Sequence, residues 1–416
     1  MILNRKKVID ALEHREGTLP IDFGSTAVTG MHISVVEKLR SYFGLPDEPV
    51  KVIEPYQMLG YIDEQLREVL KIDTVGVPTE NTIFGFPLGG EKEWMTPWGQ
   101  KVLVPDAFEI TENEKEVFVY PQSDRTAAPS GRMPKSSFFF DTIERQEPID
   151  EDKLDPKDNL EEFGLLTDSQ IDYYRQRVNI AHESGNAVVT AIPGTAFGDI
   201  ALVPAPFLKK PKGIRNIAEW YMSTAIRQDY IHKIFEQQLE YAIENLKKLN
   251  AAAGDKIDVL FICGTDFGTQ TGQFCSVDAF RTLWKPYYQK LNGWIHENTS
   301  WKTFKHSCGA IFELVEELID SGFDILNPVQ CSATGMAPAD LKRQYGSRIT
   351  FWGGGVDTQK ILPFGSPQEV KEDVENKCRV FAKDGGFVFN SIHNVQAMTP
   401  VENVAAMFET VWQFNK

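Results

Sequence analysis

Cysteine is scarce in this sequence of 416 residues, which contains only five. A sparse, odd-numbered set in a long chain does not suit a disulfide framework. We therefore expect a reducing, cytoplasmic environment, where a cysteine near a histidine is a candidate metal ligand or catalytic group. The five are Cys263, Cys275, Cys308, Cys331 and Cys378.

Long apolar runs and basic clusters are also missing. No stretch approaches the roughly 18 apolar residues of a membrane helix, so we expect no membrane partner. Lys+Arg 43 against Asp+Glu 59 gives a net charge of −16. This balance argues against nucleic acid, because phosphate backbones select basic surfaces. A hydrophobic content of 42% and a charged content of 25% are ordinary for a soluble globular protein with a large core.

From Asp168 onward, helical patterns alternate with short strand-like runs. This alternation predicts an α/β fold with a parallel sheet. With two earlier strands at Pro20–Gly24 and Asp73–Val77 the strand count reaches eight, which predicts one TIM-type (β/α)₈ barrel over residues 1–416. The later strands are expected at Ala187–Ala191, Val259–Ile262, Thr303–His306, Asp324–Leu326, Ile349–Trp352 and Phe387–Asn390.

The first part of the chain is organised differently. Helices are expected at Lys6–Glu13, His32–Phe43 and Gln57–Leu70. Residues 81–165 are rich in Gly, Pro and short β-like runs, which predicts a β-rich insertion and connector within the barrel domain. Such a segment could cap the barrel or build a contact between two subunits of a homodimer.

The most informative motif is His306-Ser307-Cys308, at the end of a predicted strand. Residues two apart on a strand point to the same face, so one nitrogen and one sulfur can reach the same metal ion. Zinc accepts these ligands, and catalytic zinc sites commonly use three protein ligands and leave a fourth position open. We therefore predict that His306 and Cys308 bind zinc. The alternative is a buried histidine beside an inert thiol.

Two residues compete to be the third ligand. His393 follows the last predicted strand, which a closed barrel brings near the others. It could instead bind substrate or donate a proton. Cys331 lies on the loop after the next strand, although a free cysteine is most often a packing residue. The adjacent Gln330 could provide an oxygen ligand or orient a ligand.

Two carboxylates are candidate catalytic groups. Asp266 lies in the glycine-rich loop Gly264–Gly268, after a predicted strand. It could bind substrate or orient a ligand histidine, with a turn or helix cap as the alternative. Asp22 lies in the first predicted strand and could face the barrel mouth, with a turn residue as the alternative.

A run of three glycines, Gly353, Gly354 and Gly355, precedes Asp357. The run lacks the Lys and Ser/Thr of a nucleotide-binding P-loop. Close approach of the backbone to a flat or bulky cofactor is a better use of these glycines. Asn394, beside His393, is assigned to the same cofactor contact.

Residues 302–412 contain four distinctive runs: 304–309 (FKHSCG), 322–330 (GFDILNPVQ), 351–358 (FWGGGVDT), and 393–396 (HNVQ) with 400–403 (PVEN). In their order and spacing these runs together resemble the uroporphyrinogen decarboxylase superfamily. The resemblance implies a barrel with its site at the carboxyl ends of the strands.

Two branches of that superfamily differ in chemistry. The decarboxylases carry an arginine-rich signature near the first strand, whereas the corresponding stretch here, 22–27 (DFGSTA), has no arginine. The other branch contains zinc-dependent, corrinoid-linked methyltransferases similar to the methylcobamide:coenzyme M enzymes. Their zinc ligands are a His-x-Cys pair, matched by His306 and Cys308, and a later Cys, whose position here is occupied by His393.

The resemblance implies a zinc-dependent methyltransferase that moves a methyl group between a corrinoid, carried by a partner protein, and a small thiol or other small molecule. A second hypothesis is a metal-free lyase that uses Asp22, Asp73 and His393 around a tetrapyrrole. A third is a non-catalytic barrel that serves as a binding subunit.

Overall fold

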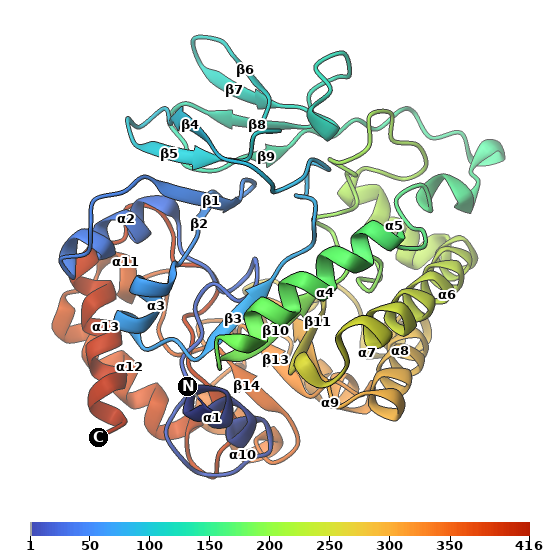
Figure 1. Cartoon of the computed structure of the whole chain (residues 1–416). Helices are drawn as coiled ribbons and strands as arrows, with labels where there is room; N and C mark the ends of the chain where they lie inside the picture. Colours follow the sequence, from blue (N-terminus) through green and yellow to red (C-terminus); the bar gives the residue numbers. More distant parts are fainter. Residues whose placement is uncertain (1) are drawn as a thin grey trace.

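A parallel sheet of seven strands forms the centre of the structure, a computed structural model that describes residues 2–416. Its order is β15-β14-β13-β12-β11-β10-β3 (Figure 1). Each strand of this sheet therefore lies beside the sheet strand that precedes or follows it along the chain. The strands are β3 (Thr74–Val77), β10 (Ala187–Ala191), β11 (Val259–Cys263), β12 (Lys302–His306), β13 (Ile325–Asn327), β14 (Thr350–Trp352) and β15 (Phe387–Val388).

Helices connect these strands and surround the sheet, as parallel pairing requires (Figure 1). The predicted α/β class and parallel sheet are therefore confirmed, and the arrangement is TIM-like. The helices after β3 are α4 (Asp168–Glu183), α5 (Ile217–Ile226), α6 (Gln228–Ala253), α7 (Val277–Leu283), α8 (Lys285–Asn298), α9 (Val315–Asp320), α10 (Pro338–Tyr345), α11 (Ile361–Phe364), α12 (Pro367–Phe381) and α13 (Val401–Phe414).

The two edges of the sheet meet at Ile21. This residue forms a parallel bridge with Phe389, just beyond β15, and its carbonyl accepts a hydrogen bond of 2.8 Å from the N–H of Asp73, just before β3. The first predicted strand is thus a single bridge rather than a strand. It nevertheless joins β15 to β3 in the manner of a TIM barrel.

Helix α1 (Ile2–Leu12) closes the amino end of the strands. Its residues Val8, Ala11 and Leu12 form one buried cluster with inward-facing strand residues such as Phe304 and Trp352. A second, larger cluster packs between the outer face of the sheet and the helices. Because the amino end is filled, the carboxyl ends of the strands form the open end, where TIM-like folds carry their chemistry.

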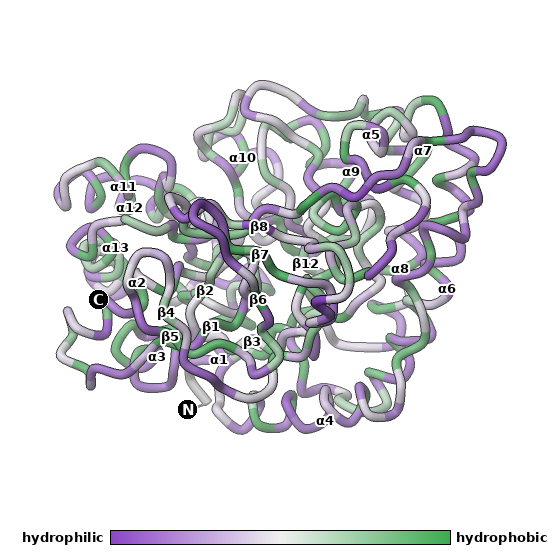
Figure 2. The backbone as a smooth tube through the Cα atoms, turned by 90° about the horizontal axis from the view of Figure 1, so that it is seen from above, coloured by the Kyte–Doolittle hydropathy of each residue, from purple (hydrophilic) through white to green (hydrophobic). Residues whose placement is uncertain are grey.

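Two small four-stranded sheets lie over this open end (Figures 1 and 2). One has the order β2-β1-β5-β4 and the other β6-β7-β8-β9. Part of this region falls in residues 81–165, but β1 and β2 precede it, so the assignment of 81–165 as an insertion stays a prediction. The strands are β1 (Val50–Glu54), β2 (Leu59–Gly60), β4 (Lys92–Met95), β5 (Lys101–Val104), β6 (Ile110–Glu112), β7 (Glu116–Val119), β8 (Gly131–Pro134) and β9 (Asp141–Thr142).

The helix expected at Gln57–Leu70 is half wrong. Helix α2 (Ile33–Tyr42) matches its prediction, but α3 covers only Glu64–Leu70, and Leu59–Gly60 form β2. A Cβ on Gly60 would approach Val36 and Val50 to 2.9 Å, so this glycine allows the strand to pack closely against its neighbours. Tertiary packing here overrides a helical spacing of apolar residues.

Among the described residues, no helix has both the length and the apolar character needed to cross a lipid bilayer.

Candidate metal centre

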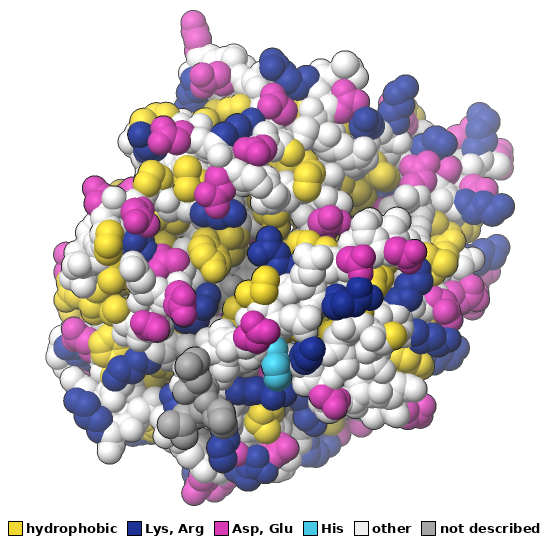
Figure 3. All heavy atoms as spheres, in the orientation of Figure 1, with side chains coloured by type: hydrophobic (Ala, Val, Ile, Leu, Met, Phe, Trp, Pro, Cys, Tyr) yellow, Lys and Arg dark blue, Asp and Glu magenta, His cyan; other side chains and the backbone are white. Residues whose placement is uncertain are grey.

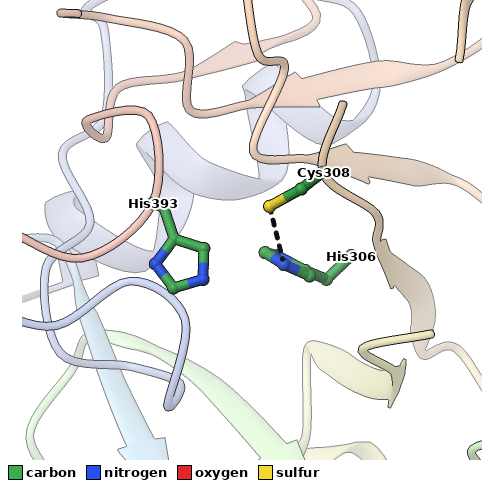
Figure 4. A group of neighbouring side chains, drawn as sticks. All are labelled: His306, Cys308 and His393. Atoms are coloured by element: carbon green, nitrogen blue, oxygen red, sulfur yellow. Dashed lines mark hydrogen bonds between the residues drawn. The ribbon is translucent and has the colours of Figure 1, made fainter. Parts of the chain in front are cut away.

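Three side chains from two distant segments converge at the open end of the sheet. His306 ends β12, Cys308 follows it, and His393 lies in the loop after β15. Their candidate ligand atoms all lie within 4.8 Å of one another, and Figure 4 shows them around a common space. The structure thus brings His393 to the predicted pair. Cys331 is not part of this group.

The tautomer of His306 is set by its neighbour on the next strand. His306 and Asn327 are paired in the β12–β13 register, and the Nδ1 of His306 lies 2.6 Å from the Oδ1 of Asn327. The Nδ2 of Asn327 donates to the carbonyl of Trp352 at 2.7 Å, which fixes the amide orientation. Nδ1 must therefore carry the proton, and the lone pair of Nε2 points toward Cys308, whose Sγ is 3.5 Å away.

His393 is arranged differently. Its Nδ1 accepts a hydrogen bond of 2.7 Å from the N–H of Asn394, so a neutral ring carries its proton on Nε2. A metal bond at Nε2 requires the opposite tautomer. His306 and Cys308 are therefore prepared for a metal, whereas His393 has to exchange its contact with Asn394 to become a ligand. A proton on Nε2 is compatible with the alternative role of a proton donor, and the choice between the two roles stays a prediction.

Asp266 connects the loop after β11 to the site. Its Oδ1 accepts a hydrogen bond of 2.7 Å from the N–H of Cys308 and lies 3.7 Å from the Nε2 of His306. The Oγ of Ser307 accepts the N–H of Phe267 at 2.9 Å, and the N–H of Ala310 donates to Thr269 at 2.7 Å. These bonds join the two loops and place Asp266 beside His306, and its role in orienting a ligand stays a prediction.

Gln330 steadies the turn after Cys308. Its Oε1 accepts the N–H of Gly309 at 2.8 Å, and its Nε2 donates to the Oε1 of Gln270 at 2.9 Å. Gln330 therefore contacts the segment that carries the thiol rather than the ligand atoms themselves.

A buried lysine lies behind these loops. Lys305 is fully buried, and its Nζ donates to the carbonyl oxygens of Thr265, at 2.5 Å, and of His306. The same ammonium lies 5.0 Å from the centre of the Phe267 ring. Its charge acts on the site from outside the barrel interior.

Burial shifts the pKa values of His306, His393, Cys308 and Asp266. It lowers the pKa of His306 to about 4 and that of His393 to about 3, so both imidazoles are neutral at physiological pH. Burial, together with the charge of Asp266, raises the pKa of Cys308 well above its ordinary value. Without a metal the thiol therefore keeps its proton. Burial also raises the pKa of Asp266, while the N–H of Cys308 and the charge of Lys305 act in the opposite direction.

The site opens into a cavity of about 1760 Å³ between the small sheets and the barrel. Figure 3 shows this face of the molecule hollowed, with hydrophobic side chains around the hollow. His306, His393 and Asp266 line the cavity, and so do aromatic residues such as Tyr56 and Tyr174. A volume above the usual ~300–1,000 Å³ of small-ligand pockets leaves room for more than one reactant.

Several residues predicted to contact substrate or cofactor have structural contacts instead. Asp22 is fully buried, and its two oxygens accept hydrogen bonds from Thr74 at 2.6 Å and Trp352 at 2.8 Å. It is not among the residues that line the cavity. Cys331 donates to the carbonyl of Val329 at 3.2 Å. The interior of the barrel and the backbone thus satisfy these groups.

The triple glycine is packed against protein rather than presented to a cofactor. A Cβ on Gly355 would meet the ring of Phe389 at 2.3 Å, and one on Gly353 would meet the carbonyl of Pro328 at 2.8 Å. Asp357 caps the next turn by accepting the N–H groups of Gln359 and Lys360 at 2.7 and 3.1 Å.

Asn394 has a similar structural role. Its side chain bonds the N–H of Gly30 at 2.5 Å and the carbonyl of Ala27 at 2.8 Å, and so ties the loop after β15 to an early segment of the chain.

Comparison with known proteins identifies the family to which the chain belongs. The family model for uroporphyrinogen decarboxylase (URO-D) matches residues 152–414. The chain belongs to this family. Among curated proteins no match is found for this URO-D family chain.

Solved structures show the fold that this URO-D chain shares. A methyltransferase from Methanosarcina mazei superposes with a TM-score of 0.55 at 14% identity, over 99% of this chain and 99% of that chain. Endo-glycoceramidase II from Rhodococcus sp. reaches 0.33 at 10% identity, over 60% of this chain and 66% of that one. A GH113 beta-1,4-mannanase reaches 0.29 at 14% identity, over 58% and 79%. The last two scores are too low to support an argument.

The sequence prediction assigned no role to Asn327, because its pairing with His306 depends on the register between β12 and β13. Replacing Asn327 by Leu removes the acceptor for Nδ1–H of His306, and we expect zinc affinity to fall about 10- to 100-fold. Competition with a chromophoric chelator measures this affinity. Asn327→Asp retains an acceptor and is expected to lose less. Equal affinity in Asn327→Leu and the unaltered protein would refute the role.

Proposed function

We propose that this chain is a zinc-dependent methyltransferase that moves a methyl group between a corrinoid, carried by a partner protein, and a small thiol or other small molecule. The observation that carries the proposal is the convergence of two imidazoles and one thiol within 4.8 Å. The URO-D family barrel and the methyltransferase named among its structural neighbours agree with it.

The donor set suits zinc. Two ligands at ordinary zinc distances and a tetrahedral angle are separated by about 3.5 Å. The Sγ of Cys308 and the Nε2 of His306 are 3.5 Å apart. His306, Cys308 and His393 would provide the three protein ligands, with the fourth position facing the cavity. Bound there, zinc would stabilise the thiolate form of an incoming thiol by its charge.

Residues of this chain would carry out proton transfer and shield the reacting groups. The carboxylate of Asp266 lines the cavity 3.7 Å from the Nε2 of His306 and would accept the proton that an acceptor thiol loses. Once both reactants fill the cavity, its hydrophobic and aromatic walls would exclude water from the reacting groups and strengthen electrostatic interactions there. The small sheets cover the open end and leave the hollow of Figure 3 as the approach for both reactants.

The direct test combines metal content with turnover. Protein purified without added metal is analysed for zinc, and methyl transfer from methylcobalamin to small thiols is followed by the visible spectrum of the corrinoid. We expect one zinc per chain and transfer that stops when a chelator removes it. A metal-free protein that is unable to methylate any thiol would refute the proposal.

Zinc affinity is expected to depend on pH. The raised pKa of Cys308 keeps its thiol protonated at neutral pH, while His306 and His393 are already neutral. Zinc binding therefore releases one proton from the thiol, and affinity should rise about tenfold per pH unit between pH ~6.5 and ~8.5. Chelator competition at several pH values measures the slope. An affinity that is independent of pH would contradict the assignment of Cys308.

Two of the three residues that the lyase hypothesis requires, Asp22 and Asp73, do not face the cavity. Asp22 is enclosed by Thr74 and Trp352. Asp73 lies at the amino end of β3, where its side chain pairs with Lys7 at 2.8 Å and accepts the N–H of Ile21 at 3.0 Å. Neither carboxylate can reach a tetrapyrrole in the cavity. Turnover of a porphyrinogen by metal-free protein would reverse this judgement.

A further inference from the structure

A second carboxylate faces the cavity beside the candidate metal centre. Asp199 follows β10 and lines the same cavity as His306 and Asp266. Its Oδ2 accepts the N–H of Gly264 at 3.2 Å, and its Oδ1 accepts the N–H of Ala201 at 3.0 Å. Among the described residues, no Lys, Arg or His forms an ion pair with it. Asp199 is thus oriented by the backbone while its charge remains uncompensated.

The two carboxylates are close enough to affect each other. Burial, and also the charge of Asp266, raise the pKa of Asp199 to about 6, so at neutral pH it is largely ionised. The negative charge of Asp199 in a cavity with apolar walls is costly unless a cation accompanies it. The nearby ammonium of Lys305 is directed at backbone carbonyls behind the loop and does not line the cavity.

The positive residues of the cavity wall are engaged with protein or lie away from the strand ends. Three are in ion pairs: Arg40 with Asp63, Lys51 with Glu91 at 2.8 Å, and Arg215 with Glu162 at 2.9 Å. Arg67, on α3, donates to the carbonyl of Ile62 at 3.1 Å, and Arg177 is exposed on α4, 5.8 Å from the Tyr173 ring. Near the metal centre, the described cavity lining therefore favours a positively charged group over a negatively charged one.

We infer that Asp199, together with Asp266, selects an acceptor thiol that also carries a protonated amine. The inference rests on the proposed methyltransferase function. The ammonium binds the carboxylate of Asp199 while the sulfur occupies the open position of the metal centre. The thiol proton passes to Asp266, the sulfur forms a bond to the methyl group, and the methyl–cobalt bond breaks with its electron pair left on the corrinoid of the partner.

Binding to the metal-free protein tests the ammonium site without any catalysis. Calorimetry compares 2-(methylthio)ethylamine with its neutral analogue 2-(methylthio)ethanol. We expect the amine to bind about 10- to 100-fold more tightly, the range of a hydrogen bond between charged partners. Asp199→Asn should remove this preference. Glu64→Gln, which changes an exposed carboxylate on α3 that also lines the cavity, should preserve it.

Turnover tests the acceptor class. With methylcobalamin as donor, we compare 2-aminoethanethiol, 2-mercaptoethanol and 2-mercaptoethanesulfonate. The aminothiol should have the lowest KM and the sulfonate the highest. Asp199→Asn should raise the KM of the aminothiol to that of the neutral thiol, with a change in its kcat of less than about threefold, because the carboxylate acts on binding rather than on the methyl transfer step.

The outcomes separate the two claims. Failure of every thiol to accept a methyl group would overturn the proposed function, and with it the assignment of an acceptor. Transfer that favours the neutral or anionic thiol, or an aminothiol KM unchanged in Asp199→Asn, would overturn the role of Asp199 and leave the methyltransferase proposal standing.

Discussion

Cys308→Ala is expected to yield a folded protein that has lost its zinc. The substitution removes the only sulfur of the three-residue group and leaves two imidazoles, one of which is engaged with Asn394. Loss of a supporting residue around a metal typically weakens binding about 10- to 100-fold, so loss of a ligand should exceed about 100-fold. Zinc analysis after dialysis measures this effect, and methyl transfer should fall in proportion to the zinc content.

Cys331→Ala is the matched control. It also removes one thiol from a loop after a sheet strand, but Cys331 lies outside the ligand group and bonds a backbone carbonyl. Its zinc content and transfer rate should equal those of the unaltered protein. Retention of zinc in Cys308→Ala together with loss in Cys331→Ala would exchange the roles of the two cysteines and refute the site described above.

Gly309→Ala is expected to destabilise the protein and to distort the metal centre. Gly309 has φ +90, and a Cβ there would meet the carbonyl carbon of Gly268 at 2.3 Å and the carbonyl oxygen of Thr269 at 2.6 Å. The strained backbone and the overpacking each cost about 1–3 kcal/mol, so unfolding free energy should fall by roughly 2–6 kcal/mol. Denaturant unfolding measures the loss.

The same substitution should weaken zinc binding, because the contact between the two loops also carries the hydrogen bond from Cys308 to Asp266. Gly272→Ala is the control, since Gly272 lies in the loop after β11 and a Cβ there meets nothing within 4 Å. It should leave both stability and affinity close to those of the unaltered protein. Equal unfolding free energies for Gly309→Ala and Gly272→Ala would show that the loops yield without strain.

Local patterns predicted the central sheet well. The strands expected at Ala187–Ala191 and Thr303–His306 agree with β10 and β12 to within one residue. These elements have strong apolar periodicity and are buried as the pattern implies. Spacing alone does not report where a helix changes direction: α5 and α6 are separated at Arg227, although helical spacing runs through both.

Site residues were predictable only where a strand determined their direction. His306 follows from the pattern of β12, and Cys308 lies two residues beyond it. Asp22 does not follow, because the strand-like run at Pro20–Gly24 forms a single bridge. The glycine run after β14 has two positive φ angles, at Gly353 and Gly354, a conformation that glycine adopts readily. The sequence did not reveal what packs against this run. The contacts are made by distant segments of the protein rather than by a ligand.

The sequence by itself determined the α/β class, the family and the candidate pair His306 and Cys308, because each depends on patterns of residue types along the chain. The tertiary structure alone decided that His393 rather than Cys331 joins them, that Asp22 is enclosed, and that Asp199 faces the cavity. Those outcomes depend on how loops after different strands are brought together when the two edges of the sheet meet, and no local spacing encodes that distance.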